Sequence, residues 1–470
     1  MNGNSRQNER RAASSGDLTE LIQNAIDRKK AVGPLKEETV RREERLSGGN
    51  NNKNNGRKRS ANRQGGWSMR KKTGVVLGFI FLGLVAVMGI GVGLFFHYTN
   101  LFDRSSDTTI NSGAQPFNSS EYVDGEDTID PVALEAELKK QLGNVQSPIT
   151  DENVMNILLI GEDIRDTENQ DRGNTDVMMI ISINHEQGTI TLTSLMRDMW
   201  VYMEKYNESG KLNSAYWHEG ATYLKEVIED YFGIKIDRHV KVNFRQFIDI
   251  VEAVGGLDLE VSYTEARAMM DPLDEQNHYL GYKRETDYID LEQYGVDPAT
   301  QSFTWGDEDE PKIKMHLNGN QALSYARIRY DCGDDYGRTM RQRIVIQEVI
   351  KKAKDLNFIQ LDSLANKVFP EVQTDITDGE FASLLLNAFD YMKYDIQQLR
   401  IPADNYYRNQ VIANMQVLTP NFQANMAIMK YVIYGDKTNA EDAAEQYEKE
   451  IADGTFYENN SLPEVPYYWW

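Results

Sequence analysis

The chain has 470 residues, of which 40% are hydrophobic, so it is too long for one ordinary domain and too apolar to be disordered throughout. Its single cysteine, Cys332, excludes an internal disulfide framework and a cysteine-based zinc site. The formal net charge of −22 argues against a polyanionic partner, but it averages two unlike parts: residues 1–72 hold 18 basic and 8 acidic residues, while the remainder has a net charge of −32.

An uncharged stretch separates these two parts. No Lys, Arg, Asp or Glu lies between Lys72 and Asp103, and residues 73–98 are almost entirely apolar. A helix crosses a bilayer with about 20 apolar residues, so this stretch predicts a single transmembrane helix. The alternative, a cleaved signal peptide, would begin near residue 1 and have a shorter apolar core. The basic residues before the stretch place the N-terminus in the cytoplasm and the acidic part outside the cell.

The regions flanking this helix are polar. Residues 1–72, rich in Asn, Ser, Gly, Arg and Lys, are predicted to be a disordered basic tail in the cytoplasm. Attraction to anionic lipid headgroups explains the charge of this tail better than binding to nucleic acid, so we expect the lipid bilayer as a partner and no nucleic acid. Residues 99–151 are predicted to be an extracellular spacer containing one helix, at 132–142, and residues 436–470 an acidic C-terminal tail.

Residues 152–435 alternate strand-like and helix-like segments, which predicts one mixed α/β domain with helices on both faces of a sheet, a three-layer α/β/α arrangement. Residues 264–314 are irregular and polar, and we interpret them as an insertion or a lid. Apolar runs bounded by turn residues predict strands, the second and third joined as a hairpin, at 156–161, 177–184, 189–195 and 257–261. Helical periodicity predicts helices at 224–232, 247–254, 319–326 and 338–356.

Glycines, arginines and aspartates gather in four places of this acidic domain. Asp163 and Arg165 directly follow the first strand, and ligands of open α/β sheets bind at the carboxyl ends of strands. Asp176 precedes the second strand, and Arg197 and Asp198 follow the third. Two carboxylates at such strand ends, Asp163 and Asp176, can share a hard cation such as Mg²⁺. From spacing alone, a pair of solvated turn aspartates is an equally good interpretation.

The densest cluster holds four arginines within fifteen residues: Arg327, Arg329, Arg338 and Arg341. If residues 327–330 are extended, the first two point to one face, and the last two lie one turn apart on a helix expected to begin near Gly337. Cations at a helix N-terminus oppose the macrodipole and repel one another, so we expect an anion such as a phosphate between them. Salt bridges to nearby acids explain any one of these arginines but explain four of them poorly. No GxSxG, HExxH or Walker motif occurs, which disfavours serine-triad and histidine–metal hydrolysis.

Several of these motifs, in this order, resemble the LytR–CpsA–Psr family. The similarity extends over about residues 153–352, with an insertion near 264–314. In the first half it rests on NILLIGEDIR at 156–165, DVMM at 176–179, RD at 197–198 and KLNSAY at 211–216. In the second half it rests on VGGL at 254–257, LNGNQAL at 317–323, ARIR at 326–329, DYGR at 335–338 and RQ at 341–342.

The resemblance implies a membrane-anchored phosphotransferase that moves a secondary cell-wall glycopolymer, such as a teichoic acid or a capsule, from a polyprenyl-pyrophosphate carrier to a peptidoglycan acceptor. It implies Mg²⁺ or Mn²⁺ as the cofactor, held by Asp163 and Asp176. The catalytic residues that it implies are Arg197, with Asp198 and Asp335 as alternatives for activating the acceptor hydroxyl. The side chains that it implies for binding the pyrophosphate are Arg165, Arg197, Arg327, Arg329, Arg338, Arg341 and Gln342.

Two positions depart from the family pattern. Asn174 stands where the family usually has an arginine, two residues before Asp176, and Arg172 is the nearest replacement. Met196 stands where a proline usually precedes Arg197, which alters local rigidity more than charge. Two other functions are alternatives: a phosphatase or pyrophosphatase acting on the same lipid carrier, and a non-enzymatic regulator of the envelope or of transcription. Against the regulator, residues 1–72 contain no DNA-reading motif.

Overall fold

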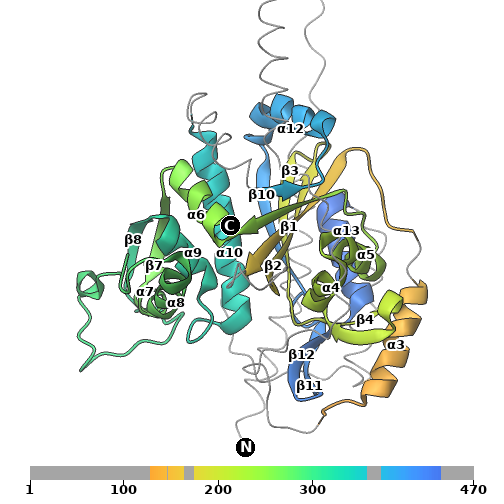
Figure 1. Cartoon of the computed structure of the whole chain (residues 1–470), viewed down its shortest axis with the longest axis horizontal. Coiled ribbons are helices and arrows are strands. Elements are labelled where there is room, and N and C mark those ends of the chain that lie inside the picture. The colour runs from red at the N-terminus through yellow and green to blue at the C-terminus, as the bar shows by residue number, and fades with distance from the viewer. Residues whose placement is uncertain (1–126, 145–146, 164–173, 357–371, 436–470) are drawn as a thin grey trace, which may run out of the picture. The chain divides into compact units, whose positions relative to one another are not determined.

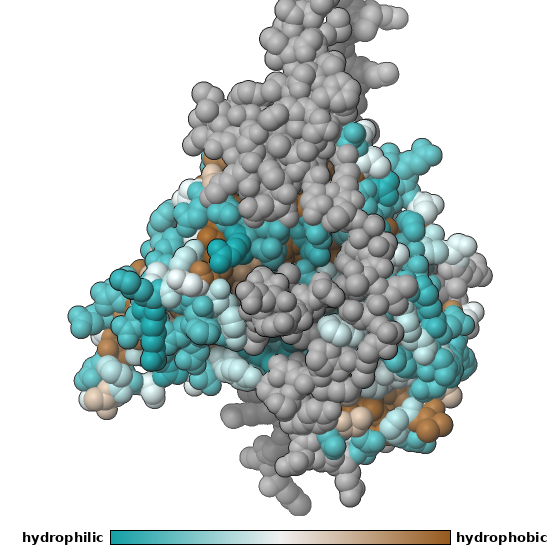
Figure 2. Space-filling view, in the orientation of Figure 1, coloured by the Kyte–Doolittle hydropathy of each residue, from teal (hydrophilic) through white to brown (hydrophobic). Residues whose placement is uncertain are grey.

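The computed structural model describes residues 127–144, 147–163, 174–356 and 372–435 (Figure 1). The predicted cytoplasmic tail, transmembrane helix and C-terminal tail lie outside these residues. Within them, no helix combines the length and the apolar character that a membrane span requires. On the face shown in Figure 2, the described residues are mostly hydrophilic, and apolar area is confined to small patches.

Within the described residues, a mixed sheet of six strands forms the centre of the domain. In sheet order the strands are β10 (Asp395–Ile401), β3 (Thr189–Leu195), β2 (Asn174–Asn184), β1 (Val154–Asp163), β6 (Arg238–Asn243) and β9 (Gln373–Thr374). β1, β2 and β3 are antiparallel neighbours, which confirms the first three predicted strands and the predicted hairpin. β10 is parallel to β3, and β6 is parallel to β1. The continuous apolar run of β1 suits a strand covered on both faces, because Leu158 and Ile157 enter different cores.

Three helices cover one face of this sheet: α4 (Leu212–Glu219), α5 (Ala221–Phe232) and α13 (Phe422–Tyr434) (Figure 1). Leu224, Val227 and Ile228 of α5 are buried in the core on this face, which confirms the predicted helix. α5 ends before Gly233, whose φ of 58° is left-handed. Two hairpins extend the core, one of β4 (Trp200–Met203), the short helix η2 (Glu204–Tyr206) and β5 (Glu208–Lys211), the other of β11 (Tyr407–Ile412) and β12 (Met415–Pro420).

Two helices cover the opposite face, α10 (Asp334–Lys354) and α12 (Asp378–Tyr391). Ile346 of α10 packs against the core that contains β3, and Phe381 of α12 packs against the core that contains β1. The predicted mixed α/β domain is therefore confirmed, with helices on both faces of its sheet. The helix predicted at 338–356 is confirmed as α10, although it begins four residues earlier than expected.

A second core lies beside the sheet, and α10 contacts both. Its other elements are α6 (Phe244–Ala253), β7 (Leu257–Ser262), α7 (Tyr263–Ala268), α8 (Met270–Leu280), η3 (Leu291–Tyr294), β8 (Lys312–Leu317) and α9 (Gly319–Arg327). The predicted strand is confirmed as β7, and the two predicted helices are confirmed as α6 and α9. α6 begins at a capping box formed by Asn243 and Gln246. The turn into β7 requires glycine, because Gly256 has a φ of 78° and a Cβ there would lie 2.6 Å from the ring Nε2 of His316.

The prediction of an irregular segment at 264–314 is wrong for its first part, which forms most of α7 and all of α8, and for its last residues, which belong to β8. The sequence pattern does not predict α8 because the buried side of this helix includes polar residues. Gln276 and Asn277 are fully buried, and they donate hydrogen bonds to the carbonyl groups of Asn320 at 2.7 Å and Thr286 at 3.0 Å. A search for apolar periodicity cannot recognise a helix face that is satisfied by hydrogen bonds.

The predicted helix at 132–142 is confirmed as α3 (Pro131–Asn144), but it is not part of a free spacer. Leu134 and Leu138 lie one turn apart and are buried in the core shared with α4, α5 and α13. The folded domain therefore begins before the predicted boundary at residue 152.

Replacing Leu138 with Ala should lower the free energy of unfolding by about 2–5 kcal/mol, because the substitution leaves a cavity in a packed core. Val132 on the same helix is 78% exposed, so Val132→Ala should change the free energy by less than about 0.5 kcal/mol. Urea unfolding followed by tryptophan fluorescence measures both. Equally small effects of the two substitutions would show that α3 is not packed on the domain.

Candidate functional site

Asp176 lies at a β-bulge near the shared end of β1 and β2. Gly161 pairs with Val177, and Glu162 pairs with Thr175, so Asp176 has no partner in the ladder between the two strands. A bulge redirects a side chain out of the regular alternation of its strand. The packing leaves no room for a side chain at position 161, where a Cβ would lie 2.7 Å from the Cβ of Val177.

Two arginines converge on the carboxylate of Asp176. Arg197 Nη1 donates a hydrogen bond to Oδ1 at 2.6 Å, and Arg338 Nη1 lies 4.0 Å from Oδ2. Both arginines are buried. Burial alone would raise the pKa of Asp176, but the positive charges of Arg197, Arg338 and Arg327 outweigh burial and hold this pKa well below its usual range. Asp176 is therefore ionised at physiological pH.

Asp335 joins this group from the first turn of α10. Its Oδ1 lies 2.8 Å from Arg338 Nη2 and 3.3 Å from Arg329 Nε. The start of α10 depends on Gly337, where a Cβ would lie 2.0 Å from the carbonyl oxygen of Cys332. Because this connection is so tight, one arginine before α10 and one within its second turn reach the same carboxylate.

Asp198 is held by Lys211, a residue that the sequence did not assign to the site. Lys211 Nζ lies 2.7 Å from Asp198 Oδ1, and Arg197 Nε lies 3.8 Å from Oδ2. The pairing of β4 with β5 brings Lys211 opposite Trp200, two residues after Asp198. The only sequence signal for this lysine was its place at the head of the KLNSAY motif, which says nothing of its partner.

The ionisation of Asp198 follows from these contacts. Burial alone would raise its pKa, but the charges of Arg197 and Lys211, a hydrogen bond from Lys211 and the neighbouring carboxyl group of Asp335 lower it. Asp198 and Asp335 thus lie close enough to interact, and the two residues proposed for activating an acceptor belong to one cluster.

Three predicted side chains are not seen in this cluster. Arg165 lies outside the described residues, and so does the side chain of Asp163, whose backbone on β1 pairs with Asn174. Gln342 is buried, with its amide 3.5 Å from the carbonyl oxygen of Ala326. The roles assigned to these three residues stay predictions.

Arg327 is anchored to the second core instead of being extended. It is the last residue of α9, so the extended geometry that would put Arg327 and Arg329 on one face is not present. Its Nη2 lies 2.5 Å from Glu275 Oε2, and its guanidinium lies 4.7 Å from the centroid of the Phe244 ring. Arg327 is nevertheless close enough to lower the pKa of Asp176.

Arg341 occupies a structural position. It is fully buried, its Nη2 donates a hydrogen bond to the carbonyl oxygen of Ile328 at 2.8 Å, and its Nη1 lies 3.4 Å from Glu265 Oε1. Burial raises the pKa of Glu265, and Arg341 opposes that rise. Arg341 therefore fixes the connection between α9 and α10 through Ile328 and Glu265. It does not face Asp176 together with Arg338.

Carboxylates compensate these arginines, which corrects the expectation that nearby acids account for them poorly. Within the described residues the cluster holds four cations, Arg197, Lys211, Arg329 and Arg338, and three carboxylates, Asp176, Asp198 and Asp335. One positive charge is in excess. An entering phosphate would therefore compete with aspartates for guanidinium groups that are already oriented.

Asp176 is the described carboxylate that best fits a metal ligand. Across the described part of the chain, no group of three or more His, Cys, Asp or Glu side chains is arranged to hold a metal ion. Mg²⁺, however, is often bound through one or two carboxylates together with substrate phosphates. An ionised Asp176 with a 28% exposed side chain fits that mode of binding.

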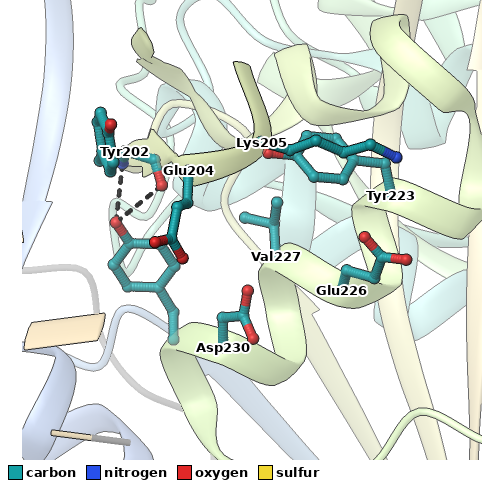
Figure 3. A pocket seen from close by; sticks show the side chains of 8 residues that line it. Tyr202, Glu204, Lys205, Tyr223, Glu226, Val227 and Asp230 are labelled. Atoms are coloured by element: carbon teal, nitrogen blue, oxygen red, sulfur yellow. Dashed lines mark hydrogen bonds between the residues drawn. The ribbon is translucent and has the colours of Figure 1, made fainter. Parts of the chain in front are cut away.

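A cavity of about 260 Å³ lies at the other end of the β4–β5 hairpin, between η2 and α5 (Figure 3). It is lined by Tyr202, Glu204, Lys205, Tyr223, Glu226, Val227, Asp230 and Tyr231. Burial raises the pKa of Asp230, and the like charges of Glu226 and Glu204 raise it further. Three acids against one lysine disfavour a phosphate, so this cavity is not an alternative position for the chemistry of the arginine cluster.

Fold and site together define an α/β protein whose central sheet and α10 bring buried arginines, a lysine and aspartates into one charged cluster. A model of the LytR_cpsA_psr family matches residues 119–431. The chain belongs to this family, as its motifs indicated. The match also includes α3, in agreement with the packing of that helix on the domain.

Relatives with assigned names are similar over most of the folded part. A protein of Enterococcus faecalis, named polyisoprenyl-teichoic acid–peptidoglycan teichoic acid transferase TagU, is 26% identical over 331 residues, which are 69% of this chain and 87% of that protein. Biofilm regulatory protein A of Streptococcus mutans is 32% identical over 244 residues, 50% of this chain and 53% of that protein. The crystal structure of B. subtilis TagV is 23% identical and covers 64% of this chain and 99% of its own, with a TM-score of 0.42. The prediction of an enzyme, a transferase of this family, is confirmed.

Arg341→Met should lower the free energy of unfolding by about 3–5 kcal/mol, because it leaves Glu265 as an uncompensated buried charge. Arg329→Met is the matched control: it removes a partly exposed arginine from Asp335, which keeps Arg338, and should cost about 1 kcal/mol or less. Urea unfolding of the full chain in detergent compares the two variants. An Arg341→Met protein as stable as Arg329→Met would contradict the structural role.

Proposed function

We propose that the protein is a membrane-anchored phosphotransferase that moves a secondary cell-wall glycopolymer from a polyprenyl-pyrophosphate carrier to peptidoglycan. Its predicted transmembrane helix and basic N-terminal tail keep the catalytic domain at the outer surface of the membrane, where a lipid-linked substrate is available. Membership of the family and the name of the Enterococcus faecalis relative support a teichoic acid or a similar polymer as the substrate.

The observation that carries this proposal is the convergence of Arg197 and Arg338 on Asp176 in a largely buried cluster. Guanidinium groups held in place before the substrate arrives stabilise the charge of a transferring phosphoryl group without reorganising at that moment. Arg197, Arg329 and Arg338 bind the pyrophosphate in this proposal, with Arg165 and Arg327 as further predicted contacts. Such an arginine contributes about 10³–10⁵ to the rate of phosphoryl transfer in known cases.

Asp198 suits the role of general base better than Asp335. Asp335 has two guanidinium groups on the same oxygen, at 2.8 and 3.3 Å, so that oxygen is occupied by cations and is not open to an acceptor hydroxyl. Asp198 has one close cation, Lys211, on Oδ1, while Oδ2 lies 3.8 Å from the Arg197 Nε. In the proposed step Oδ2 takes the proton of a peptidoglycan hydroxyl, whose oxygen bonds to the sugar-linked phosphorus. The bond from that phosphorus to the bridging oxygen breaks, and polyprenyl phosphate leaves.

Asp176 and, on the facing strand, Asp163 would hold the divalent cation in this proposal. When bound, Mg²⁺ or Mn²⁺ would neutralise charge on the pyrophosphate oxygens. The chain's own residues account for the remainder: Arg197 orients Asp176 through the 2.6 Å hydrogen bond, and Arg338 links Asp176 to Asp335.

Arg338→Ala should reduce transfer of polymer from a polyprenyl-pyrophosphate donor to peptidoglycan by at least about 10³-fold, because it removes a guanidinium from the phosphoryl group. Arg284→Ala is the matched control, since Arg284 is an exposed arginine whose side chain is 80% accessible, and it should retain full activity. Circular dichroism verifies that both variants are folded.

Product analysis with and without acceptor separates transfer from hydrolysis. Release of free polymer phosphate at the same rate in both cases would show that the protein is a phosphatase and not a transferase. Normal attachment of polymer by Arg338→Ala would exclude the arginine cluster as the active site.

Lys211→Met should move the acid limb of the kcat/KM–pH profile to higher pH, by about one pH unit or more. The base must be ionised, and Lys211 lowers the pKa of Asp198; removing this charge raises that pKa, so activity is lost at a higher pH as the pH falls. Lys211→Arg keeps the charge and should leave the limb in place. An acid limb that Lys211→Met does not move would exclude Asp198 as the base.

A further inference from the structure

Arg343 is a buried arginine that the proposed mechanism does not use. It lies on α10, where it is 8% exposed. Its Nη1 donates a hydrogen bond to Ser194 Oγ at 2.9 Å, and its Nε donates one to Gln398 Oε1 at 3.2 Å. Both acceptors are neutral, and no carboxylate in the described residues lies within salt-bridge distance of its guanidinium.

The other buried arginines of this region have acidic partners. Arg197 has Asp176, Arg338 has Asp335 and Arg341 has Glu265. Burying a charge without a counter-charge is strongly unfavourable, whereas a paired charge recovers much of that free energy. Arg343 is therefore a feature that folding alone disfavours.

A second guanidinium, that of Arg400, lies near Arg343. Arg400 lies on β10 directly opposite Ser194 in the parallel pair with β3. Asp404 pairs with Arg400, and the ring of Tyr336 lies 4.7 Å from the Arg400 guanidinium and holds it in place. Burial, and then the charge of Arg400, lower the pKa of Arg343 to about 9, so Arg343 stays protonated at neutral pH.

We propose that Arg343 and Arg400 form a second oxyanion position, beside the arginine cluster, that binds a phosphate group. Two planar guanidinium groups and the Ser194 hydroxyl supply donors suited to a tetrahedral oxyanion. An anion there would provide the counter-charge that the described residues lack.

This position adjoins the first cluster through two elements. Ser194 precedes Arg197 by three residues, and Tyr336 follows Asp335 directly on α10. A substrate that carries more than one phosphate can therefore occupy both positions. The phosphate can come from the head group of a lipid carrier or from the polymer itself, and both present the same oxyanion.

The alternative is a purely structural role, in which Arg343 only connects α10 with β3 and β10 through its two hydrogen bonds. The two interpretations predict opposite effects of Arg343 on the stability of the protein. An arginine that serves as a connector stabilises the empty protein, whereas an arginine kept for an anion destabilises the protein until the anion binds.

Thermal unfolding of the full chain in detergent, titrated with inorganic phosphate, tests the proposal without any turnover. Arg343→Met should have a Tm equal to or above that of the parent protein in phosphate-free buffer. The phosphate concentration that gives half of the rise in Tm should increase at least about tenfold, the loss expected for a charge-assisted hydrogen bond. Because no transfer is measured, this result does not depend on the proposed function.

Arg238→Met is the matched control. Arg238 has a carboxylate partner, Glu380, at 2.6 and 2.7 Å, so its replacement should lower the Tm and leave the phosphate response unchanged. An Arg343→Met protein with a lowered Tm and the parent's phosphate response would overturn the proposal in favour of the connector. An unchanged phosphate response would overturn it at any Tm.

Repeating the titration with polyprenyl phosphate in nanodiscs and with a soluble glycerol-phosphate oligomer identifies the source. If Arg343→Met loses the Tm response to polyprenyl phosphate, the position binds the carrier. If it loses the Tm response to the glycerol-phosphate oligomer, the position binds the polymer. Full responses to both, alongside a full response to inorganic phosphate, would reject the position.

Discussion

The structure of the site depends on the balance of charge in a volume from which water is largely excluded. Asp176, Asp198 and Asp335 hold the surrounding cations in fixed positions. Without these carboxylates, four positive charges would repel one another and favour exposed conformations. With them, the guanidinium groups keep their orientation, and under the proposed function a phosphate would exchange one set of oxygen acceptors for another. The excess of one positive charge gives that exchange its direction.

The fold supplies this balance from segments that are far apart in sequence. The bulge at Asp176 turns a carboxylate out of β2, and the β4–β5 pairing returns Lys211 to Asp198. The close approach of Gly337 to the carbonyl group of Cys332 sets Asp335 at the head of α10. Each of these devices lies on a regular element or at its end, where packing on two cores restricts movement. The described side chains of the site are therefore positioned by the sheet and by α10, which suits chemistry that consists mostly of positioning.

The sequence predicted the elements whose pattern is simple. The apolar runs of β1, β2 and β3 and the periodicity of α5 and α6 are signals of burial, and the structure confirms them. No element after residue 356 was predicted. β10 gives a weak signal because it alternates Gln and Arg with apolar residues and finds its partner, β3, about two hundred residues earlier in the chain. The arginine clusters were located, but their partners were not. Arg338 and Arg341 look alike in sequence and both are buried, so only their partners in the structure distinguish the one that faces Asp176 from the one that holds Glu265.

That difference bears on how charged residues are interpreted in such a domain. A buried arginine with a carboxylate partner is compatible with structure or with function, because pairing lowers the cost of burial in both cases. Arg341 and Arg197 show this ambiguity, since each has an acid within 3.4 Å. A buried arginine whose partners are neutral is more informative, because folding gains little from it. Arg343 is such a residue, and its place between β3, β10 and α10 extends the positively charged region from the arginine cluster toward the edge of the sheet.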